Sequence, residues 1–296
     1  MSESNELYTL RDYLRWAISR FNQAGLFYGH GTLSATDEAF ALILPSLHLP
    51  HDLSPHLYDA RLTKTERDHL ALLIERRIKE RIPVPYLTHE AWFAGLSFYV
   101  DERVLIPRSP LAELIENQFT PWVIPDTVHH ILDLCTGSGC IAIACAEFFP
   151  NAQIDASDIS KEALNVAKTN VLRYELENQV HLHESNLFHA LPPKHYDIII
   201  SNPPYVDATE MAALPQEFQH EPILGLAAGL KGLDYVEHIL KEALHYLTPQ
   251  GILVVEVGNS ETALIKKYPN IPFTWLAFER GGGGVFLLTR EQLQHI

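Results

Sequence analysis

Cysteine is scarce in this sequence, and the few cysteines present are not spaced for a zinc site. Cys135, Cys140 and Cys145 lie five residues apart in one apolar stretch of a 296-residue chain. An odd number of thiols cannot all pair, and no second cluster completes a metal site. This excludes a disulfide-stapled miniprotein, and we expect three small buried side chains in a reducing compartment. The histidines show no metal-ligand spacing either, so we expect no metal.

Long apolar runs and positive charge are also scarce. No stretch approaches roughly 18 uninterrupted apolar residues, and residues 1–11 lack the basic start and apolar run of a signal peptide. We therefore expect a soluble, cytoplasmic protein with no membrane partner. The chain carries 22 Lys and Arg against 37 Asp and Glu, a net charge of −15. Nucleic-acid-binding proteins usually show a basic footprint, so this charge favours a basic protein as partner.

The composition is that of a globular protein, with 47% hydrophobic and 20% charged residues. Its length predicts one large domain or two of unequal size. Residues 1–85 predict a helical domain that recognises the substrate. Apolar residues at helical spacing end at Gly25, and a second short helix over 37–44 is expected to end at Pro45.

A third helix has the clearest boundaries. Thr63 and Glu66 form a candidate capping box, and Pro83 follows the last apolar residue of the pattern. The region from Arg61 to Arg81 has a local excess of positive charge. A solvated helix face explains that excess, and an incidental contact with RNA is the alternative.

Residues 86–110 predict a β-hairpin linker, because aromatic and β-branched residues flank Gly95. From residue 111 to 296, apolar strand patterns alternate with helical ones. Such alternation predicts a doubly wound, mostly parallel α/β sheet. Two strand patterns near the end are separated only by Gly281–Gly284, so the last strand is expected to run antiparallel.

The first chemical motif is a glycine-rich turn between a strand and a helix, around Gly137 and Gly139. Such a turn brings backbone N–H groups close to a ligand. A dinucleotide site is one interpretation, and a purely structural turn is another. However, Ala142 replaces the third glycine of that fingerprint, and Asp133 before the turn would repel a pyrophosphate. A ligand with a positive sulfonium and an amino-acid tail suits the motif better.

Polar residues follow the next two strands at matching places. Asp158 ends the second strand pattern, where a carboxylate can accept hydrogen bonds from both ribose hydroxyls. Asn186 and Leu187 follow the third strand and are placed to line an adenine ring. Together these residues predict one adenosyl ligand across the carboxyl ends of the strands.

The most specific motif is Asn202-Pro203-Pro204-Tyr205 after the fourth strand. The prolines fix the backbone and leave carbonyls without local partners. The Asn202 side-chain oxygen and the Pro203 carbonyl are then placed to accept both hydrogens of a planar NH₂ group, with Tyr205 stacked on its plane. Alignment of that nitrogen with a sulfonium methyl would permit an in-line displacement.

These motifs resemble the S-adenosylmethionine-dependent methyltransferases that modify planar NH₂ groups of adenine, cytosine or glutamine. The segments Phe93–Phe98, Val104–Arg108, His220–Pro222 and Val255–Gly258 narrow the resemblance to the bacterial glutamine N5-methyltransferases. The resemblance implies a seven-stranded Rossmann-like sheet with an antiparallel last strand. It also implies a small helical N-terminal domain joined by a β-hairpin.

That family has one branch that acts on peptide release factors and one that acts on the third large-subunit ribosomal protein. The release-factor branch carries Arg-Pro-Asp/Glu-Thr-Glu after its Ile-Pro, whereas this chain has Arg108-Ser109-Pro110. This departure resembles the ribosomal-protein branch. It implies methyl transfer from S-adenosyl-L-methionine to one glutamine of that basic protein, either free or within an assembly particle.

The implied site residues fall into three groups. Arg108 and Glu221 are the substrate-binding candidates, with an interdomain salt bridge as the alternative for Arg108 and a helix-entry role as the alternative for Glu221. The catalytic candidates are Asn202, Pro203, Pro204 and Tyr205. The cofactor-binding candidates are Asp133, Cys135, Gly137, Gly139, Asp158, Asn186 and Leu187.

Three other functions remain open at this point. The first is glutamine methylation of release factors. The second is methylation of the adenine amine in nucleic acid, which the charge does not support. The third is a ribosome-assembly factor whose binding matters more than its methyl transfer, although the intact motifs favour catalysis.

Overall fold

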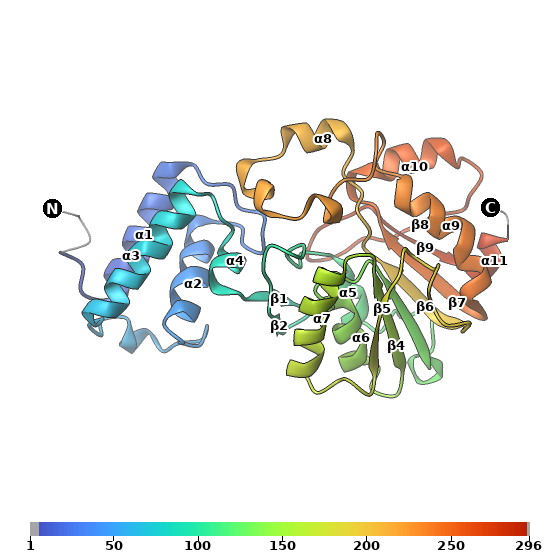
Figure 1. Cartoon of the computed structure of the whole chain (residues 1–296), viewed down its shortest axis with the longest axis horizontal. Coiled ribbons are helices and arrows are strands. Elements are labelled where there is room, and N and C mark those ends of the chain that lie inside the picture. The colour runs from blue at the N-terminus through green and yellow to red at the C-terminus, as the bar shows by residue number, and fades with distance from the viewer. Residues whose placement is uncertain (1–5, 295–296) are drawn as a thin grey trace. The chain divides into compact units, whose positions relative to one another are not determined.

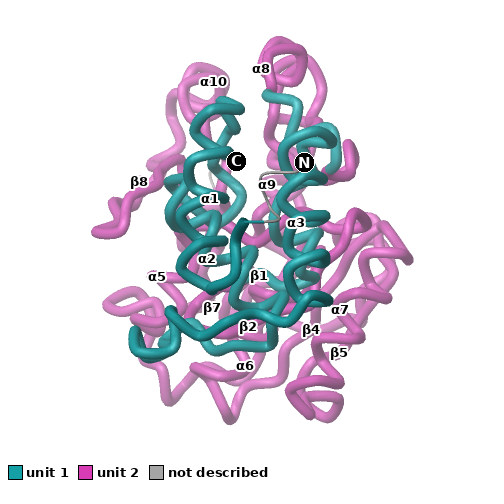
Figure 2. The backbone as a smooth tube through the Cα atoms, turned by 90° about the vertical axis from the view of Figure 1, so that its left-hand side faces the viewer, with its two compact units in different colours: residues 1–91, 215–220 teal, residues 92–214, 221–296 magenta. Residues whose placement is uncertain are grey.

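A computed structural model of the chain describes residues 6–294. It forms two compact units (Figure 2). Unit 1 runs to Ala91 and also contains 215–220, while unit 2 comprises 92–214 and the chain from Glu221 onward. The chain thus enters unit 2, returns to unit 1 for a short segment, and enters unit 2 again. No helix in the described chain has the length and apolarity needed to cross a bilayer.

Unit 1 is helical. A capping box of Thr9 and Asp12 begins its first helix, and Gly25 ends that helix with a left-handed φ of 57°. The predicted capping box of Thr63 and Glu66 is confirmed at the start of the third helix. The helices of unit 1 are α1 (Leu10–Ala24), α2 (Ala35–Ser46), α3 (Lys64–Lys79) and α4 (Val84–Thr88), with short 3₁₀ turns at Pro55–Leu57 and Gln216–His220.

The prediction that Pro45 ends the second helix is wrong, since α2 continues through it to Ser46. Pro45 lies in the last turn, where only one backbone hydrogen bond is lost. The neighbouring groups restore the turn: the Ser46 hydroxyl donates to the Leu42 carbonyl (2.6 Å), and the Leu47 N–H donates to the Ile43 carbonyl (3.2 Å).

The predicted hairpin linker is present but shorter than expected. Strands β1 (Ala91–Phe93) and β2 (Leu96–Phe98) pair through a turn in which Ala94 and Gly95 both have positive φ. Residues 84–88 form helix α4 instead of strand, because Pro85 in its first turn favours a helix start.

The sheet of unit 2 confirms the predicted fold class (Figure 1). Its strand order is β5-β4-β3-β6-β7-β9-β8, with β9 antiparallel to both β7 and β8 and the other pairs parallel. The strands are β3 (His130–Leu134), β4 (Gln153–Asp158), β5 (Val180–Glu184), β6 (Tyr196–Ser201), β7 (Leu247–Glu256), β8 (Thr274–Trp275) and β9 (Val285–Thr289).

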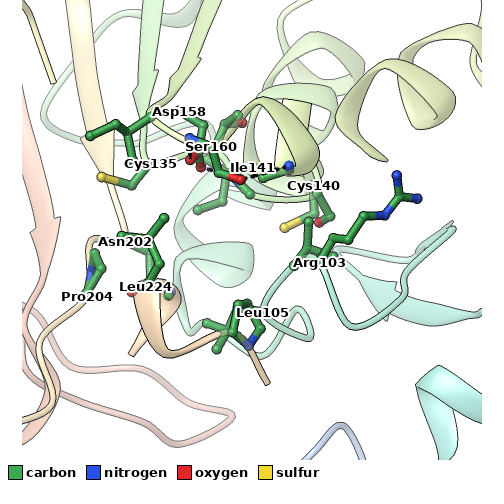
Figure 3. A pocket seen from close by; sticks show the side chains of 18 of the residues that line it. Arg103, Leu105, Cys135, Cys140, Ile141, Asp158, Ser160, Asn202, Pro204 and Leu224 are labelled. Carbon is green, nitrogen blue, oxygen red and sulfur yellow. Dashed lines mark hydrogen bonds between the residues drawn. The ribbon is translucent and has the colours of Figure 1, made fainter. Parts of the chain in front are cut away.

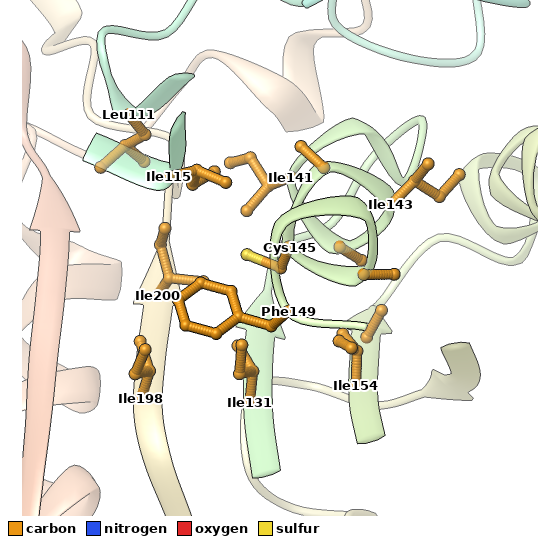
Figure 4. Packing of buried hydrophobic residues seen from close by; sticks show 14 of the residues in the cluster. Leu111, Ile115, Ile131, Ile141, Ile143, Cys145, Phe149, Ile154, Ile198 and Ile200 are labelled. Atoms are coloured by element: carbon orange, nitrogen blue, oxygen red, sulfur yellow. The ribbon is translucent and has the colours of Figure 1, made fainter. Parts of the chain in front are cut away.

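Helices cover both faces of this sheet because its central strands are apolar on both sides. Ile198 and Ile200 pack into one core with α6 and α5, which Figure 4 shows, while Ile199 packs into the other with α9. The helices of unit 2 are α5 (Leu111–Glu116), α6 (Cys140–Phe148), α7 (Lys161–Arg173), α8 (Ala208–Ala213), α9 (Asp234–Tyr246), α10 (Glu261–Lys267) and α11 (Arg290–Leu293), with 3₁₀ turns at Pro125–Thr127, Ile223–Gly225 and Gly258–Ser260.

The register of the parallel strands brings their carboxyl ends to one edge. Leu134 of β3 is paired with Ser157 of β4 and with Ser201 of β6, and Asp158 is paired with Glu184 of β5. The four loops that carry the predicted motifs therefore begin side by side, as is usual for ligand sites in open α/β sheets.

Candidate active site

A cavity lies at this edge of the sheet, entirely within unit 2 (Figure 3). Its walls come from the loops after β3, β4, β5 and β6, from the segments 103–109 and 222–225, and from Tyr235 of α9. Of the predicted site residues, eight line it: Arg108, Cys135, Gly137, Asp158, Asn186, Leu187, Asn202 and Pro204. Five do not: Asp133, Gly139, Pro203, Tyr205 and Glu221.

The glycine-rich loop between β3 and α6 turns through left-handed backbone. Cys135, Gly137 and Gly139 have φ of 62°, 55° and 80°. At Gly139 a Cβ atom would lie 3.2 Å from the Cβ of Ala167, so the close packing of the loop against α7 requires a glycine here. The loop is held to β4 by the Thr136 N–H, which donates to the Ser157 carbonyl (2.9 Å).

Asp133 takes a different place from the one predicted. It is fully buried beneath the loop, where one carboxyl oxygen accepts hydrogen bonds from the Thr136 hydroxyl and the Ala142 N–H. Burial raises the pKa of Asp133 to about 7. Because this carboxyl group does not reach the cavity wall, it shapes the loop instead of presenting a charge to the ligand.

Asp158 is the carboxylate that lines the cavity. Its two oxygens accept hydrogen bonds from the Gly137 N–H and the Ser160 N–H, both at 2.9 Å. Burial raises its pKa above the usual value for aspartate, and these backbone donors oppose that shift. Each oxygen keeps a lone pair for a further donor such as a ribose hydroxyl.

The loop after β5 presents Asn186 and Leu187 to the cavity. Leu187 has a left-handed φ of 51°. The Ser185 hydroxyl stabilises this turn by donating to the Leu187 carbonyl (2.7 Å) and accepting from the Ala190 N–H (3.0 Å). The loop therefore offers one apolar and one amide side chain side by side, a pair that suits the face and edge of a purine.

The loop after β6 places the amide-binding candidates. The Ser201 hydroxyl donates to the Leu134 carbonyl (2.8 Å), which ties the end of β6 to β3. Asn202 and Pro204 face the cavity, as Figure 3 shows. Within residues 6–294 the Asn202 carboxamide has no hydrogen-bond partner, so it is available to a ligand.

Tyr205 lies differently from the predicted stacking on the substrate. Its hydroxyl donates to the Glu256 carboxylate (2.8 Å), and its ring packs on Gly258, where a Cβ atom would lie 2.5 Å from Cε2. Burial and Glu256 raise the pKa of Tyr205, so the phenol stays protonated. Pro203 is buried, which leaves only its backbone as a candidate ligand group.

Arg108 and Glu221 bind each other. The two guanidinium nitrogens of Arg108 donate to the two oxygens of Glu221, each at 2.6 Å, and the Ile106 N–H adds a third bond to this carboxylate at 3.1 Å. This salt bridge lies within unit 2, to which both residues belong, so it is not the interdomain salt bridge that was the alternative for Arg108. The pair joins the segment before α5 to the segment 222–225, and both form cavity wall.

Sequence reasoning missed several lining residues. Tyr235 lies in the first turn of α9, and Leu105, Pro222 and Leu224 form an apolar wall. No local pattern marks Tyr235, because only the packing of α9 brings it to the cavity that Asp158 and Cys135 also line. The only sequence signal for the segment before Arg108 was its resemblance to the corresponding segment of the family.

These residues fit an adenosyl ligand with a sulfonium group. The cavity combines the Asp158 carboxylate, the tightly turned backbone at Gly137 and apolar side chains. It extends from these groups to the Asn202 carboxamide. No group of three or more His, Cys, Asp or Glu side chains suited to a metal occurs in the part of the chain that the structure describes.

Comparisons with known proteins agree with this geometry. The model of the methyltransferase small domain family matches residues 116–222. The ribosomal protein uL3 glutamine methyltransferases of Neisseria gonorrhoeae and Neisseria meningitidis are each 52% identical to this chain over 98% of its length, covering 97% and 96% of theirs. A human methyltransferase 10 domain containing protein, 18% identical, covers 77% of this chain and 99% of its own with a TM-score of 0.49.

Proposed function

The chain belongs to the family of ribosomal protein uL3 glutamine methyltransferases, and we propose that its cavity transfers a methyl group from S-adenosyl-L-methionine to the side-chain amide of one uL3 glutamine. The main structural support for this proposal is the Asn202 carboxamide. It faces the cavity and has no hydrogen-bond partner in the described chain. When bound, the cofactor supplies an electrophilic methyl group on a sulfonium.

The cofactor would be held at the adenosyl side of the cavity. Asp158 would accept hydrogen bonds from the ribose hydroxyls, and Asn186 and Leu187 would line the adenine ring. The loop at Gly137 would contact the cofactor through its backbone. Asp133 supports this loop from below, and we assign it no contact with the cofactor.

Asn202 and Pro203 would orient the substrate. The Asn202 side-chain oxygen and the Pro203 carbonyl would accept the two hydrogens of the glutamine NH₂ group, while Pro204 holds the turn rigid. An amide nitrogen is a poor nucleophile because its lone pair is delocalised, so positioning supplies most of the acceleration. The nitrogen becomes more acidic as it bonds to carbon, and no strong base is needed beforehand.

The helical unit 1 would recognise the protein substrate, and the acidic charge of the chain suits a basic ribosomal protein, either free or in an assembly particle. An RNA contact at α3 receives little support. Three of its cations are paired along the helix, as Lys64 with Asp68, Arg76 with Glu80 and Lys79 with Glu75.

The direct test compares Asn202→Ala with Asn165→Ala, an exposed change on α7. We expect Asn202→Ala to lower methyl transfer to unmethylated uL3 by about 10²–10³-fold, as for other preorganised hydrogen-bonding groups. Cofactor affinity, measured by calorimetry, should change less than about twofold, since no wall of the adenosyl region is removed. Asn165→Ala should match the wild type.

The same reactions should contain unmethylated release factor and labelled cofactor, with the label located by peptide mass spectrometry. Label on one uL3 glutamine and not on release factor supports the assignment. Full activity of Asn202→Ala, or label only on release factor, contradicts it.

A further inference from the structure

Tyr205 is fixed at three points. Besides the hydrogen bond from its hydroxyl to Glu256 and the packing of its ring on Gly258, its carbonyl accepts a hydrogen bond from the Ser260 hydroxyl at 2.9 Å. At Gly232 a Cβ atom would lie 2.2 Å from the Tyr205 carbonyl oxygen, so the backbone of another loop also closes on this residue. Tyr205 is therefore an anchor and not a mobile side chain.

Glu256 is the centre of that anchor. It ends strand β7 and is buried, with one carboxyl oxygen bound by the Tyr205 hydroxyl. The other oxygen accepts a hydrogen bond from the Ser109 hydroxyl. Two hydroxyl groups thus donate hydrogen bonds to one buried carboxyl group. These bonds offset the free-energy cost of burying that polar group.

Ser109 comes from the segment in which this chain departs from the release-factor pattern. A proline at this position would have no hydroxyl to offer Glu256. Ser109 also accepts the Leu111 N–H (3.1 Å) at the start of α5 and follows Arg108 directly. A residue at which this chain departs from the release-factor pattern is therefore bonded to the carboxylate that holds Tyr205.

Resting on the proposed function, we propose that Ser109 and Glu256 are positioning residues that hold Tyr205, and through it the Asn202–Pro204 turn, in the geometry needed to grip the substrate amide. The turn has few free dihedrals because its two prolines fix φ. It is tied at one end by Ser201 to β3 and at the other by Tyr205 to Glu256. Misplacement by about 1 Å is enough to cost on the order of 10²-fold in rate.

The test uses the full-length chain with unmethylated uL3 and S-adenosyl-L-methionine. We expect Glu256→Ala and Tyr205→Phe each to lower kcat by about 10–100-fold. The KM for uL3 and the calorimetric Kd for the cofactor should stay within about twofold. Glu256→Gln should retain kcat within about threefold, because its amide oxygen still accepts the Tyr205 hydroxyl and its NH₂ group can donate to Ser109.

A mutant cycle separates positioning from simple structural support. Because Glu256 acts through the Tyr205 hydroxyl, the Glu256→Ala/Tyr205→Phe double variant should be no slower than the slower single variant within about threefold. Ser109→Ala should lower kcat by about 3–10-fold. The control Ser34→Ala, which removes the hydroxyl that caps α2 in unit 1, should leave kcat unchanged. If Glu256→Ala does not fold, the Ser109→Ala/Tyr205→Phe cycle replaces it, and its double variant should again be no slower than the slower single variant within about threefold.

Multiplicative losses in the double variant, or a lowered melting temperature with unchanged kcat per folded molecule, overturn the inference. Failure of this inference is distinguishable from failure of the proposed function. If wild type methylates uL3 and Asn202→Ala does not, yet the Ser109 and Glu256 variants keep full kcat, only the inference fails. If wild type does not methylate uL3, the proposed function itself fails.

Discussion

Asp133 and Asp158 stand at the ends of adjacent parallel strands, yet only Asp158 reaches the cavity. Asp158 is bonded by backbone N–H groups and keeps lone pairs toward the cavity, while Asp133 is enclosed below the loop. Within the described chain, one oxygen of Asp133 has no hydrogen-bond partner. An enclosed carboxylate with so few donors favours its protonated form, which explains the raised pKa.

This predicts a pH dependence of stability. Burial raises the pKa of Asp133 from its ordinary value of 3.8 to about 7 in the folded protein, so its stabilising contribution is fully present below pH 3.8 and is lost as the pH rises through 7. Relative to Asp133→Asn, the unfolding free energy of the cofactor-free wild type should fall by at most ~1.4 kcal/mol per pH unit between pH 5 and 7. Urea unfolding across this range measures the difference.

The exposed Asp126→Asn variant is the control and should follow the wild type at each pH. An Asp133→Asn protein whose unfolding free energy has the same pH slope as the wild type would show that Asp133 is ionised in the folded state.

At the scale of elements, the buried amide of Asn170 joins helix α7 to the glycine-rich loop. Asn170 accepts the Tyr99 N–H (2.8 Å) and donates to the carbonyls of Tyr99 (3.0 Å) and Ser138 (2.8 Å). Ser138 belongs to the glycine-rich loop, and Tyr99 follows strand β2. Asn170 therefore joins three segments that are distant in the sequence.

Asn170→Ala should destabilise the protein and weaken cofactor binding. A buried polar group left unsatisfied costs ~1–3 kcal/mol, and Ser138 and Tyr99 would both lose partners. We expect an unfolding free energy lower by about that amount in urea titrations, and a calorimetric Kd for S-adenosyl-L-methionine raised several-fold. Asn165→Ala on the exposed side of the same helix should leave both unchanged, and equal effects of the two variants would refute the role of Asn170.

At the scale of the whole molecule, the chain returns to unit 1 for residues 215–220, between the Asn202–Tyr205 motif and Glu221. Glu217 from this segment is buried within unit 1, where it accepts hydrogen bonds from the Phe27 N–H (3.1 Å) and from Arg77 (3.4 Å). Arg77 is 1% exposed and also donates to Glu38 (2.7 Å) and to the Phe27 carbonyl (2.9 Å). One buried guanidinium thus holds two carboxylates from distant parts of the chain.

Arg77→Met should therefore destabilise unit 1 strongly. It leaves Glu38 buried without this cation, and Glu217 keeps only the longer Arg81 contact (3.5 Å) as an ion pair beside its hydrogen bond from the Phe27 N–H. Breaking a buried ion pair costs about 3–5 kcal/mol. Arg76→Met on the same helix removes an exposed pair with Glu80 and should cost less than about 1 kcal/mol. Urea unfolding measures both, and hydrogen exchange should show lost protection at 215–220 in Arg77→Met alone. Similar losses in the two variants would contradict the buried cluster.

Much of the fold was predictable because its signals are local. Strand patterns at Val180–Glu184 and Tyr196–Ser201 match β5 and β6, and the antiparallel last strand follows from the glycine turn that leaves no room for a crossover helix. The continuation of α2 through Pro45 and the length of the hairpin strands were not predictable from such local signals. The cost of a proline depends on where in the helix it lies, and strand length depends on a partner.

The sequence by itself determined which loops carry chemistry, since turns, strand ends and proline pairs are set by neighbouring residues. It placed Asp158, Asn202 and Pro204 at the edge where the structure has its cavity. Only the tertiary structure decided which polar groups face that cavity. Burial of Asp133, pairing of Arg108 with Glu221 and anchoring of Tyr205 on Glu256 all depend on side chains far apart in the chain, and no local pattern encodes such contacts.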